Sequence, residues 1–439
     1  MVDAARTAPE ASMRTRIFAW GMWDWGSAAF NAVILTFVFS VYLVDAVGAD
    51  LPGGTPASTW LGWFLAGAAA IAALSAPVAG RRSDELGRRK RSLILLTLAV
   101  VILVAALFFV RDDYRYLWLG LALLAIGSVT FELAQVPYFA MLQQVSTPAT
   151  VGRVSGFGFA MGYLGGIVLL LICYLGFIAG DGDTRGLLNI PTDDGLNIRV
   201  IALLCAVWFL LSAIPLFVTM PENEPRVDRS APKPSTAELY RGLGRDIRTL
   251  WQRDRNTVWF LLASAVFRDG LAGVFTFGAV LAVTVYGVGA GDVLIFGIAA
   301  NVIAALGAMV GGRLDDLIGP KPVIVGSLAA MVAVGFTLFF VSGPTMFWTL
   351  GLALCFFPGA VQSCARSYLA RMTPEGVEGQ MFGLYATTGR AVTFLSPLAF
   401  STFQVVFGSE KAGVLGLTAV LLIGLLVILP VRAPARAGR

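Results

Sequence analysis

Two long apolar runs, residues 58–79 and 92–110, flank the stretch Gly80-Arg-Arg-Ser-Asp84-Glu-Leu-Gly87-Arg88-Arg89-Lys90-Arg91. Glycine lets two backbones approach closely or adopts a positive φ, so Gly80 and Gly87 favour a tight turn. Aspartate caps helix N-termini, and arginines pair with carboxylates or with the carbonyls at helix C-termini. The stretch therefore predicts a compact cationic turn between two apolar helices.

A second copy of this pattern lies in the other half of the chain, as Gly312-Arg-Leu-Asp-Asp316-Leu-Ile-Gly319-Pro-Lys321. One copy fits an ordinary polar loop, but two copies in register indicate an internal repeat, which is how many transporters are built. The pattern resembles the cytoplasmic signature between helices 2 and 3 of the major facilitator superfamily. The candidate gating residues are Gly80, Asp84, Gly87, Arg88, Arg89, Gly312, Asp316, Gly319 and Lys321.

The composition is that of a membrane protein. Of the 439 residues, 57% are hydrophobic and 13% are charged, whereas soluble proteins carry about 25% charged residues. The absence of histidine argues against histidine proton relays, most zinc sites and Ser/His/Asp catalysis. Four cysteines lie inside apolar runs without metal-site spacing and are expected to pack as small apolar residues. We therefore expect no enzyme activity, no cofactor and no metal site.

About 20 apolar residues span a bilayer, and on that basis the sequence predicts an all-α membrane protein with twelve transmembrane helices in two six-helix bundles. The N-terminal bundle is expected over 17–220, with helices near 17–45, 58–80, 91–110, 115–143, 152–178 and 198–220. The C-terminal bundle is expected over 256–431, with helices near 256–286, 290–312, 321–342, 345–371, 378–407 and 412–431. Residues 1–16 and 432–439 are expected to be cytoplasmic end segments.

The linker over 221–255 carries four prolines and eight Lys/Arg. Within it, 236–251 has apolar residues at helical spacing, which fits either an amphipathic helix on the membrane face or a disordered connector. The linker, the termini and the loops on their side hold 24 Lys/Arg, against five on the opposite side. This asymmetry predicts cytoplasmic termini and explains the net charge of +5 without a nucleic-acid partner.

Several further stretches narrow the resemblance. They are Trp23-Asp-Trp-Gly-Ser-Ala-Ala-Phe30, the glycine-rich run 151–166, Gly359-Ala-Val-Gln-Ser-Cys-Ala-Arg-Ser367 and Gly383-Leu-Tyr-Ala-Thr-Thr-Gly-Arg390. Together they resemble the vacuole-effluxer branch of the superfamily, meaning the autophagy-related fungal effluxer and its bacterial relatives. Phe139, Gln143 and Gln144 stand where members of that branch often carry Asn, Pro and an acid. The resemblance implies export of small solutes such as amino acids.

A few charged or amide side chains lie inside the apolar runs, and such groups usually face a cavity or a partner because charge is costly within a bilayer. In the superfamily, helices 1, 4, 7 and 10 line the central cavity, with helices 2, 5, 8 and 11 beside them. The candidates fall on this set and form an expected substrate or proton pathway: Asp24, Asn31, Glu132, Gln135, Arg268, Asp269, Gln362, Arg366 and Arg390.

Structural readings of these residues stay open. Asp24 or Glu132 can pair with Arg268 or Arg390 simply to hold the two halves together, and Arg366 can extend to the inner membrane surface. Asn301 fits packing between helices better than ligand binding.

The sequence thus predicts a secondary active transporter that exports a small polar solute such as an amino acid by alternating access. No G-x-x-x-x-G-K-[ST] motif is present, so ATP is not expected to drive it directly. The alternatives are a multidrug or lipophile exporter and, in a different class, a non-transporting membrane scaffold. The expected partners are a small-molecule substrate, a proton and the lipid of the cell membrane, and the expected state is a monomer.

Overall fold

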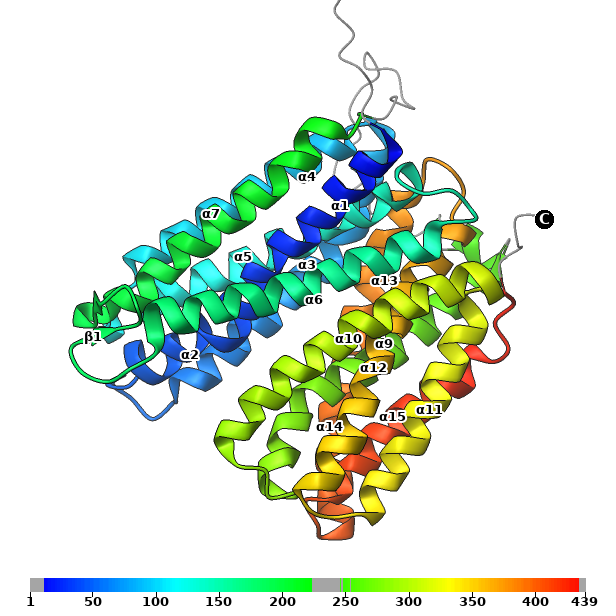
Figure 1. The fold of residues 1–439 in the computed structure, drawn as a ribbon. Helices are drawn as coiled ribbons and strands as arrows, with labels where there is room; N and C mark the ends of the chain where they lie inside the picture. The colour runs from blue at the N-terminus through cyan, green and yellow to red at the C-terminus, as the bar shows by residue number, and fades with distance from the viewer. Residues whose placement is uncertain (1–11, 223–244, 246–247, 253, 434–439) are drawn as a thin grey trace, which may run out of the picture.

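The computed structural model describes residues 12–222, 245, 248–252 and 254–433. Its elements gather in two groups, which we call the N-terminal bundle (α1 to α7) and the C-terminal bundle (α9 to α15) (Figure 1). The ribbons of the two bundles converge near the chain termini and diverge toward the opposite end (Figure 1). We call the converging end the termini side.

The N-terminal bundle opens with a long, irregular helical rod. It runs through α1 (Met13–Ala28), a π-helical stretch (Ala29–Phe37), α2 (Phe39–Tyr42) and a second π-helical stretch (Leu43–Val47). The following helices are α3 (Ala57–Glu85), α4 (Arg89–Ala106), α5 (Leu117–Ala140), α6 (Val151–Cys173) and α7 (Leu196–Thr219). A π-helical stretch (Tyr174–Ile178) extends α6, and 3-10 turns cover Leu107–Phe109, Tyr114–Tyr116, Met141–Gln144 and Asp193–Gly195. Strands β1 (Thr184–Arg185) and β2 (Ile190–Pro191) form a small antiparallel pair in the loop before α7.

The C-terminal bundle contains α9 (Arg255–Thr284), α10 (Ala290–Ile318), α11 (Pro320–Phe340), α12 (Pro344–Met372), α13 (Glu378–Ala391), α14 (Leu395–Phe407) and α15 (Ala412–Ile428). The expected helix over 378–407 is therefore interrupted, and α13 and α14 meet at a turn. Most of the expected amphipathic segment 236–251 lies outside the described residues, although 248–252 are helical.

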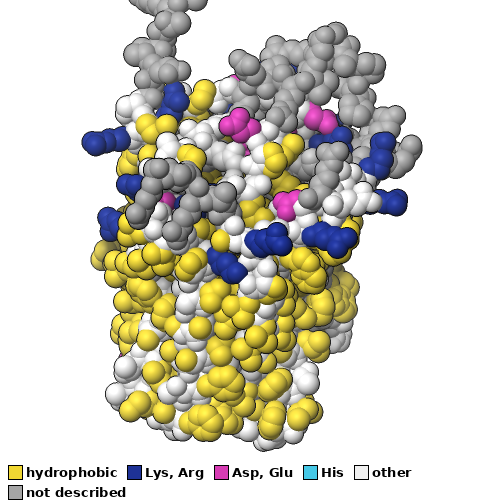
Figure 2. All heavy atoms as spheres, turned by 90° about the vertical axis from the view of Figure 1, so that its right-hand side faces the viewer, with side chains coloured by type: hydrophobic (Ala, Val, Ile, Leu, Met, Phe, Trp, Pro, Cys, Tyr) yellow, Lys and Arg dark blue, Asp and Glu magenta, His cyan; other side chains and the backbone are white. Residues whose placement is uncertain are grey.

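The helices suit a bilayer by length and composition. Among the described residues, eleven helical segments are long and apolar enough to cross a membrane. The twelfth expected span coincides with α15, whose 17 residues fall short of the roughly 20 that a full crossing needs, so the count of twelve stays a prediction. Apolar side chains form a broad belt, and Lys and Arg gather at the termini side of that belt (Figure 2).

Aromatic stacking holds the interior of each bundle. In the N-terminal bundle, the Trp23 ring stacks on Tyr138 with ring centroids 4.2 Å apart. In the C-terminal bundle, Phe260 stacks on Tyr368 at the same centroid distance of 4.2 Å. Lipid offers no hydrophobic drive between helices, so close ring packing of this kind supplies much of the attraction that joins them.

Candidate functional site

The first copy of the repeated pattern lies against the other bundle at the termini side. A Cβ added to Gly80 would lie 2.0 Å from the carbonyl oxygen of Gly379, so α3 and α13 touch through their backbones. The Asp84 carboxylate accepts hydrogen bonds from the backbone N–H groups of Gly379 (3.1 Å) and Gln380 (2.9 Å). Asp84 therefore caps the N-terminus of α13, where a negative charge is stabilised by the helix dipole.

Arg89 extends this contact into a three-residue ion network. Its guanidinium lies 2.6 Å from Asp84 Oδ1 and also donates to the Glu378 carboxylate of the other bundle. All three side chains are buried. Among the described residues, Arg89 is the member of this cationic cluster that forms an ion pair with the other bundle. The backbone N–H groups of Lys90 and Arg91 donate to Glu222.

The second copy makes the same kind of contact with the bundles exchanged: its turn belongs to the C-terminal bundle, and the helix that it caps belongs to the N-terminal bundle. A Cβ on Gly312 would lie 2.5 Å from the carbonyl oxygen of Gly152, where α10 meets α6. The Asp316 carboxylate accepts from the backbone N–H groups of Gly152 (2.8 Å) and Arg153 (3.1 Å) and from Arg153 Nε (2.9 Å). Asp316 thus caps α6 as Asp84 caps α13.

The two copies differ in their cations. Lys321, which aligns with Arg89, donates its Nζ hydrogen bond to the carbonyl oxygen of Leu429 in its own bundle. Arg371 takes the corresponding place, pairing with Asp315 and lying 3.4 Å from Asp316 Oδ1. The sequence reasoning did not single out Arg371, Asp315 or Glu378. Asp315 lies inside the second copy, next to Asp316, while Glu378 begins α13 and Arg371 lies in the last turn of α12.

Arg366 on α12 binds the N-terminal bundle within two turns of the start of α6. Its Nη1 lies 3.5 Å from Asp24 Oδ2, its Nε donates to Ser155 Oγ (3.0 Å) and its Nη2 donates to the Ser155 carbonyl (2.7 Å). The guanidinium also packs over the rings of Trp20 (4.7 Å) and Phe159 (4.3 Å). With 1% of its surface exposed, Arg366 does not extend to the membrane surface, so that alternative is wrong.

A second cross-bundle ion pair joins Arg390 at the end of α13 to Glu132 on α5. Close by, Arg268 on α9 donates from Nη1 to the Tyr385 carbonyl (3.1 Å), and its guanidinium lies 3.9 Å from the centre of the Tyr385 ring. No carboxylate of the described residues forms an ion pair with Arg268. The half-buried Arg268 is therefore a cation whose charge an incoming anion can still neutralise.

The remaining predicted pathway residues have different surroundings. Asp269 accepts from the Ser396 backbone N–H (2.7 Å) within its own bundle. Gln362 Nε2 donates to the Tyr163 hydroxyl (3.3 Å) across the bundles. Gln135 is half-buried and makes no side-chain hydrogen bond to another described residue, while Asn31 is exposed. Asn301 donates to Gly297 O in its own helix at 2.8 Å, and is thus not a group shared between bundles.

Gln143 is a cross-bundle contact that the sequence reasoning noted only as a departure from the family pattern. Its Nε2 donates to the carbonyl oxygens of Ala370 (2.6 Å) and Thr373 (3.2 Å) at the end of α12. This amide donor binds carbonyl oxygens at a helix C-terminus, which have no partner within the helix.

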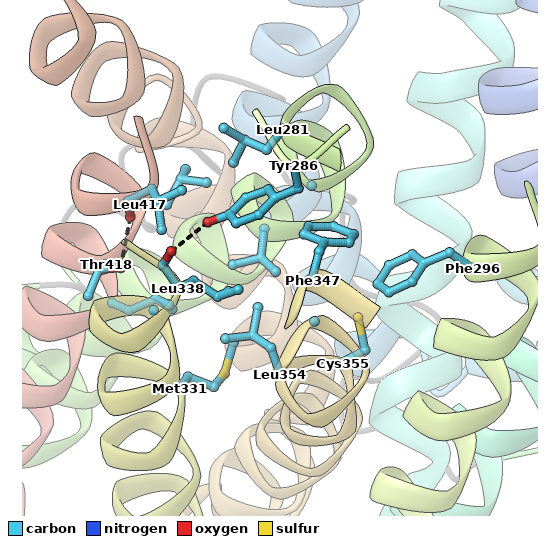
Figure 3. Close-up of a pocket in the computed structure, with 16 residues that line it drawn as sticks. Leu281, Tyr286, Phe296, Met331, Leu338, Phe347, Leu354, Cys355, Leu417 and Thr418 are labelled. Carbon is cyan, nitrogen blue, oxygen red and sulfur yellow. Dashed lines mark hydrogen bonds between the residues drawn. The ribbon is translucent and has the colours of Figure 1, made fainter. Parts of the chain in front are cut away.

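A cavity of about 60 Å³ lies inside the C-terminal bundle, away from these charges. Figure 3 shows Phe347, Leu354 and Cys355 around it, with the Tyr286 hydroxyl bonded to the Leu338 carbonyl (2.8 Å). Its lining holds no charged side chain, so it offers no partner to the charges of an amino acid. The polar residues between the bundles, and not this cavity, form the candidate site.

Comparison with known proteins places this geometry among transporters. The model of the family described as "Vacuole effluxer Atg22 like" matches residues 143–437, and the Major Facilitator Superfamily model matches residues 5–170. An uncharacterised MFS-type transporter of Bacillus subtilis is 23% identical, with 93% of each chain covered. Autophagy-related protein 22-1 of Aspergillus fumigatus is 24% identical over 56% of this chain and 42% of its own length.

Solved structures agree on the fold. The proton:xylose symporter XylE matches with a TM-score of 0.72 at 14% identity, covering 94% of both chains. The transporter FucP in its outward conformation matches with a TM-score of 0.68 at 14% identity, covering 94% of this chain and 97% of that one. At such identities the likeness establishes the fold alone.

Proposed function

Because the chain belongs to the vacuole effluxer Atg22-like family of the major facilitator superfamily, we propose that it exports a small polar solute such as an amino acid by alternating access. In this proposal twelve helices form two bundles with cytoplasmic termini, and the bundles rock about a site between them. The chain is a multi-pass membrane protein. The proposal places it in the cell membrane as a monomer, driven by a proton gradient or by the gradient of the solute itself.

The observation that carries the proposal is the position of charge between the bundles. Arg390 with Glu132 and Arg366 with Asp24 join the two bundles. Arg268, without a carboxylate partner among the described residues, lies against Tyr385 of α13, the helix that carries Arg390. Charge is retained inside a membrane mainly where it binds a ligand, moves a proton or fixes a contact. An exporter of lipophilic compounds would not need these charged side chains.

The roles follow from the geometry. Arg268 and Arg390 are the proposed partners of a substrate carboxylate, because a planar guanidinium matches a carboxylate with two parallel hydrogen bonds. Glu132 releases Arg390 when it is protonated or when it meets a substrate ammonium. Asp24, whose side chain is 15% exposed while that of Arg366 is 2% exposed, is the proposed proton acceptor.

The remaining proposed pathway residues line or support this route. Gln135 and Asn31 supply polar groups on the N-terminal bundle, and Gln362 donates to Tyr163 across the bundles. Asp269 places a carboxylate next to Arg268 in the sequence. The gating residues of the two repeated turns close the route at the termini side, in the state that the structure represents.

The direct test is counterflow in proteoliposomes that hold the purified protein. Vesicles are loaded with one unlabelled solute at a time from panels of amino acids, sugars and lipophilic cations, with and without an imposed proton gradient. The proposal expects exchange of labelled amino acids only. Exchange of sugars or lipophilic cations without exchange of amino acids would show that the protein transports another class of solute. A protein that exchanges none of the three panels would favour the alternative of a non-transporting membrane scaffold.

Variants of the two arginines sharpen this test. Arg390→Ala and Arg268→Ala are expected to lower amino-acid exchange at least tenfold, and the Lys variants less, since lysine keeps the charge but not the bidentate geometry. Arg111→Ala, an exposed arginine remote from the site, is the matched control and should exchange as the unmodified protein does. Equal exchange by Arg390→Ala and Arg111→Ala would remove Arg390 from the site.

A further inference from the structure

The interrupted helix made of α13 and α14, which we call helix 11, is joined at an irregular turn over residues 392–396. The N–H of Leu395 bonds to the Val392 carbonyl (3.0 Å), a tighter turn than that of an α-helix. The next N–H, that of Ser396, leaves the helix ladder and donates to Asp269 Oδ2 (2.7 Å). The Ser396 hydroxyl returns a hydrogen bond to the Asp269 carbonyl (2.9 Å). Asp269 thus caps the N-terminus of α14.

The residue before Asp269 holds the other half of helix 11. Arg268 donates to the Tyr385 carbonyl and lies over the Tyr385 ring, both within α13. Gly389 leaves room for it, since a Cβ there would lie 3.0 Å from Arg268 Nη1. A cation beside the last turns of α13 and an anion at the first turn of α14 both complement the helix dipole. Arg268 and Asp269, which are adjacent on α9, therefore bind helix 11 on either side of its turn.

The two halves of helix 11 have different partners. On α13, Thr387 Oγ1 bonds to the Ala73 carbonyl of the N-terminal bundle (2.5 Å), and Arg390 pairs with Glu132 of that bundle. On α14, Phe400 instead stacks on Phe277 of its own bundle, with ring centroids 4.1 Å apart. The turn that Arg268 and Asp269 hold therefore separates a segment bound to the opposite bundle from a segment bound to its own.

We propose that Arg268 and Asp269 are positioning residues that make this turn a pivot for α13. When the bundles separate at the termini side, α13 tilts about the turn while α14 stays fixed to α9 and α15. Arg390 lies in the last turn of α13, so the tilt changes its position relative to Arg268. The inference rests on the alternating motion of the proposed function, and it adds a link between that motion and the spacing of the two proposed carboxylate-binding arginines.

Spin-label distances test the pivot without any substrate. In a variant with Cys173, Cys205, Cys355 and Cys364 replaced by Ser, one label pair is Pro322→Cys near the start of α11 with Val377→Cys, the N-cap residue of α13. The control pair, Phe340→Cys with Phe407→Cys, marks the far ends of α11 and α14. A third pair, Ala149→Cys with Pro322→Cys, reports separation of the bundles, which Asp84→Asn together with Asp316→Asn promotes by removing the negative charge from both helix caps.

At about 1.5 Å per residue, a tilt of about 10° at the end of the 14-residue α13 moves its start by about 4 Å. When the Asp84→Asn and Asp316→Asn substitutions lengthen the distance of the third pair, we expect them to shift the distance of the first pair by about 4 Å in its own labelled protein. The distance of the control pair should stay unchanged. Lengthening of the third pair with both other pairs unchanged would show that helix 11 moves as one rigid rod, and would overturn the proposal.

The anchoring residues are tested in the same labelled proteins. In the closed state, Asp269→Ala should broaden the distance distribution of the first label pair. Asp269→Asn should give a narrower distribution than Asp269→Ala, because its amide oxygen still accepts the Ser396 N–H. Ser396→Ala, which keeps that N–H, is a milder second variant, and Asp292→Asn on the exposed start of α10 is the control. A first-pair distribution that is the same in Asp269→Ala, Ser396→Ala and the control would overturn the anchoring role. All these readouts are independent of whether the protein exchanges amino acids.

Discussion

Arg366 of the C-terminal bundle places its Nη1 3.5 Å from Asp24 Oδ2 of the N-terminal bundle, and the guanidinium is enclosed by Ser155 and aromatic rings. Gly158 makes the enclosure possible, since a Cβ there would lie 2.9 Å from both Arg366 Nη2 and Asp24 Oδ2. The pair therefore fixes the contact of α12 with α1 and α6, and it differs from the pairing of Asp24 with Arg390 or Arg268 that was one reading of the sequence.

Removing one member of this pair should be costly. Arg366→Ala leaves Asp24 in a site built for an ion pair, and breaking a buried pair from one side destabilises by about 3–5 kcal/mol. We expect a large loss of folded protein, measured by fluorescence-detected gel filtration. The double variant Asp24→Asn with Arg366→Gln should recover most of the abundance but not the exchange activity. Full activity in the double variant would show that neither charge takes part in transport.

The helix caps should control closure of the termini side. Asp84→Asn keeps the side-chain shape but removes the charge that faces the α13 N-terminus and Arg89. We expect slower exchange at nearly normal abundance, because each charge–dipole contact is worth about 0.3–1 kcal/mol. Glu85→Gln, in the same turn but paired among the described residues with Arg81 of its own helix, is the control. An Asp84→Asn protein that exchanges at the control rate would exclude a role in closure.

The backbone contacts of the two repeated turns make a separate prediction. Gly80→Ala places a methyl group where the Gly379 carbonyl oxygen lies, at 2.0 Å, whereas Gly67→Ala on the same helix meets no atom within 4 Å. Neither bundle can yield by that distance without separating from the other. Gly80→Ala should therefore raise the reactivity of an introduced Thr387→Cys toward a soluble thiol reagent, and Gly67→Ala should not. Equal reactivity would mean that this contact does not hold the bundles together.

Membrane topology can be tested by labelling in intact cells. Leu187 lies in the loop opposite the termini and is 80% exposed, and Ala149 is exposed on the termini side. If the termini are cytoplasmic, Leu187→Cys reacts with an impermeant thiol reagent in intact cells and Ala149→Cys reacts only after lysis. The opposite labelling pattern would reverse the proposed orientation.

The apolar cavity of the C-terminal bundle predicts opposite effects of two glycine substitutions. Gly278 and Gly335 both line it, but a Cβ on Gly278 meets no atom within 4 Å while one on Gly335 would lie 2.3 Å from Thr418 Oγ1. Alanine is about 0.5–1 kcal/mol better than glycine inside a helix, so Gly278→Ala should raise the melting temperature in detergent. Gly335→Ala should lower it, because the surrounding side chains must shift. A higher melting temperature for both variants would show that the site near Thr418 relaxes freely.

The sequence by itself determined the class of protein and its repeat. Apolar runs of bilayer length can only be satisfied as helices, because a backbone in lipid must bond to itself. The paired turns at Gly80 and Gly312 were visible because a tight contact demands glycine at fixed spacing, and a helix cap demands a carboxylate four residues later. The charges on the cavity-lining helices were visible because so few charges interrupt the apolar runs.

Only the tertiary structure decided which charges meet. Asp24 could have paired with any of three arginines, since helix periodicity gives a residue's face but not the depth or rotation of the helix opposite. Burial of Arg366 depended on Gly158 and Ser155 of another bundle, and the turn within helix 11 followed from Asp269 taking the Ser396 N–H out of the helix ladder. These are contacts between distant segments whose energies depend on distances of a few ångströms, and no local pattern in the chain encodes such distances.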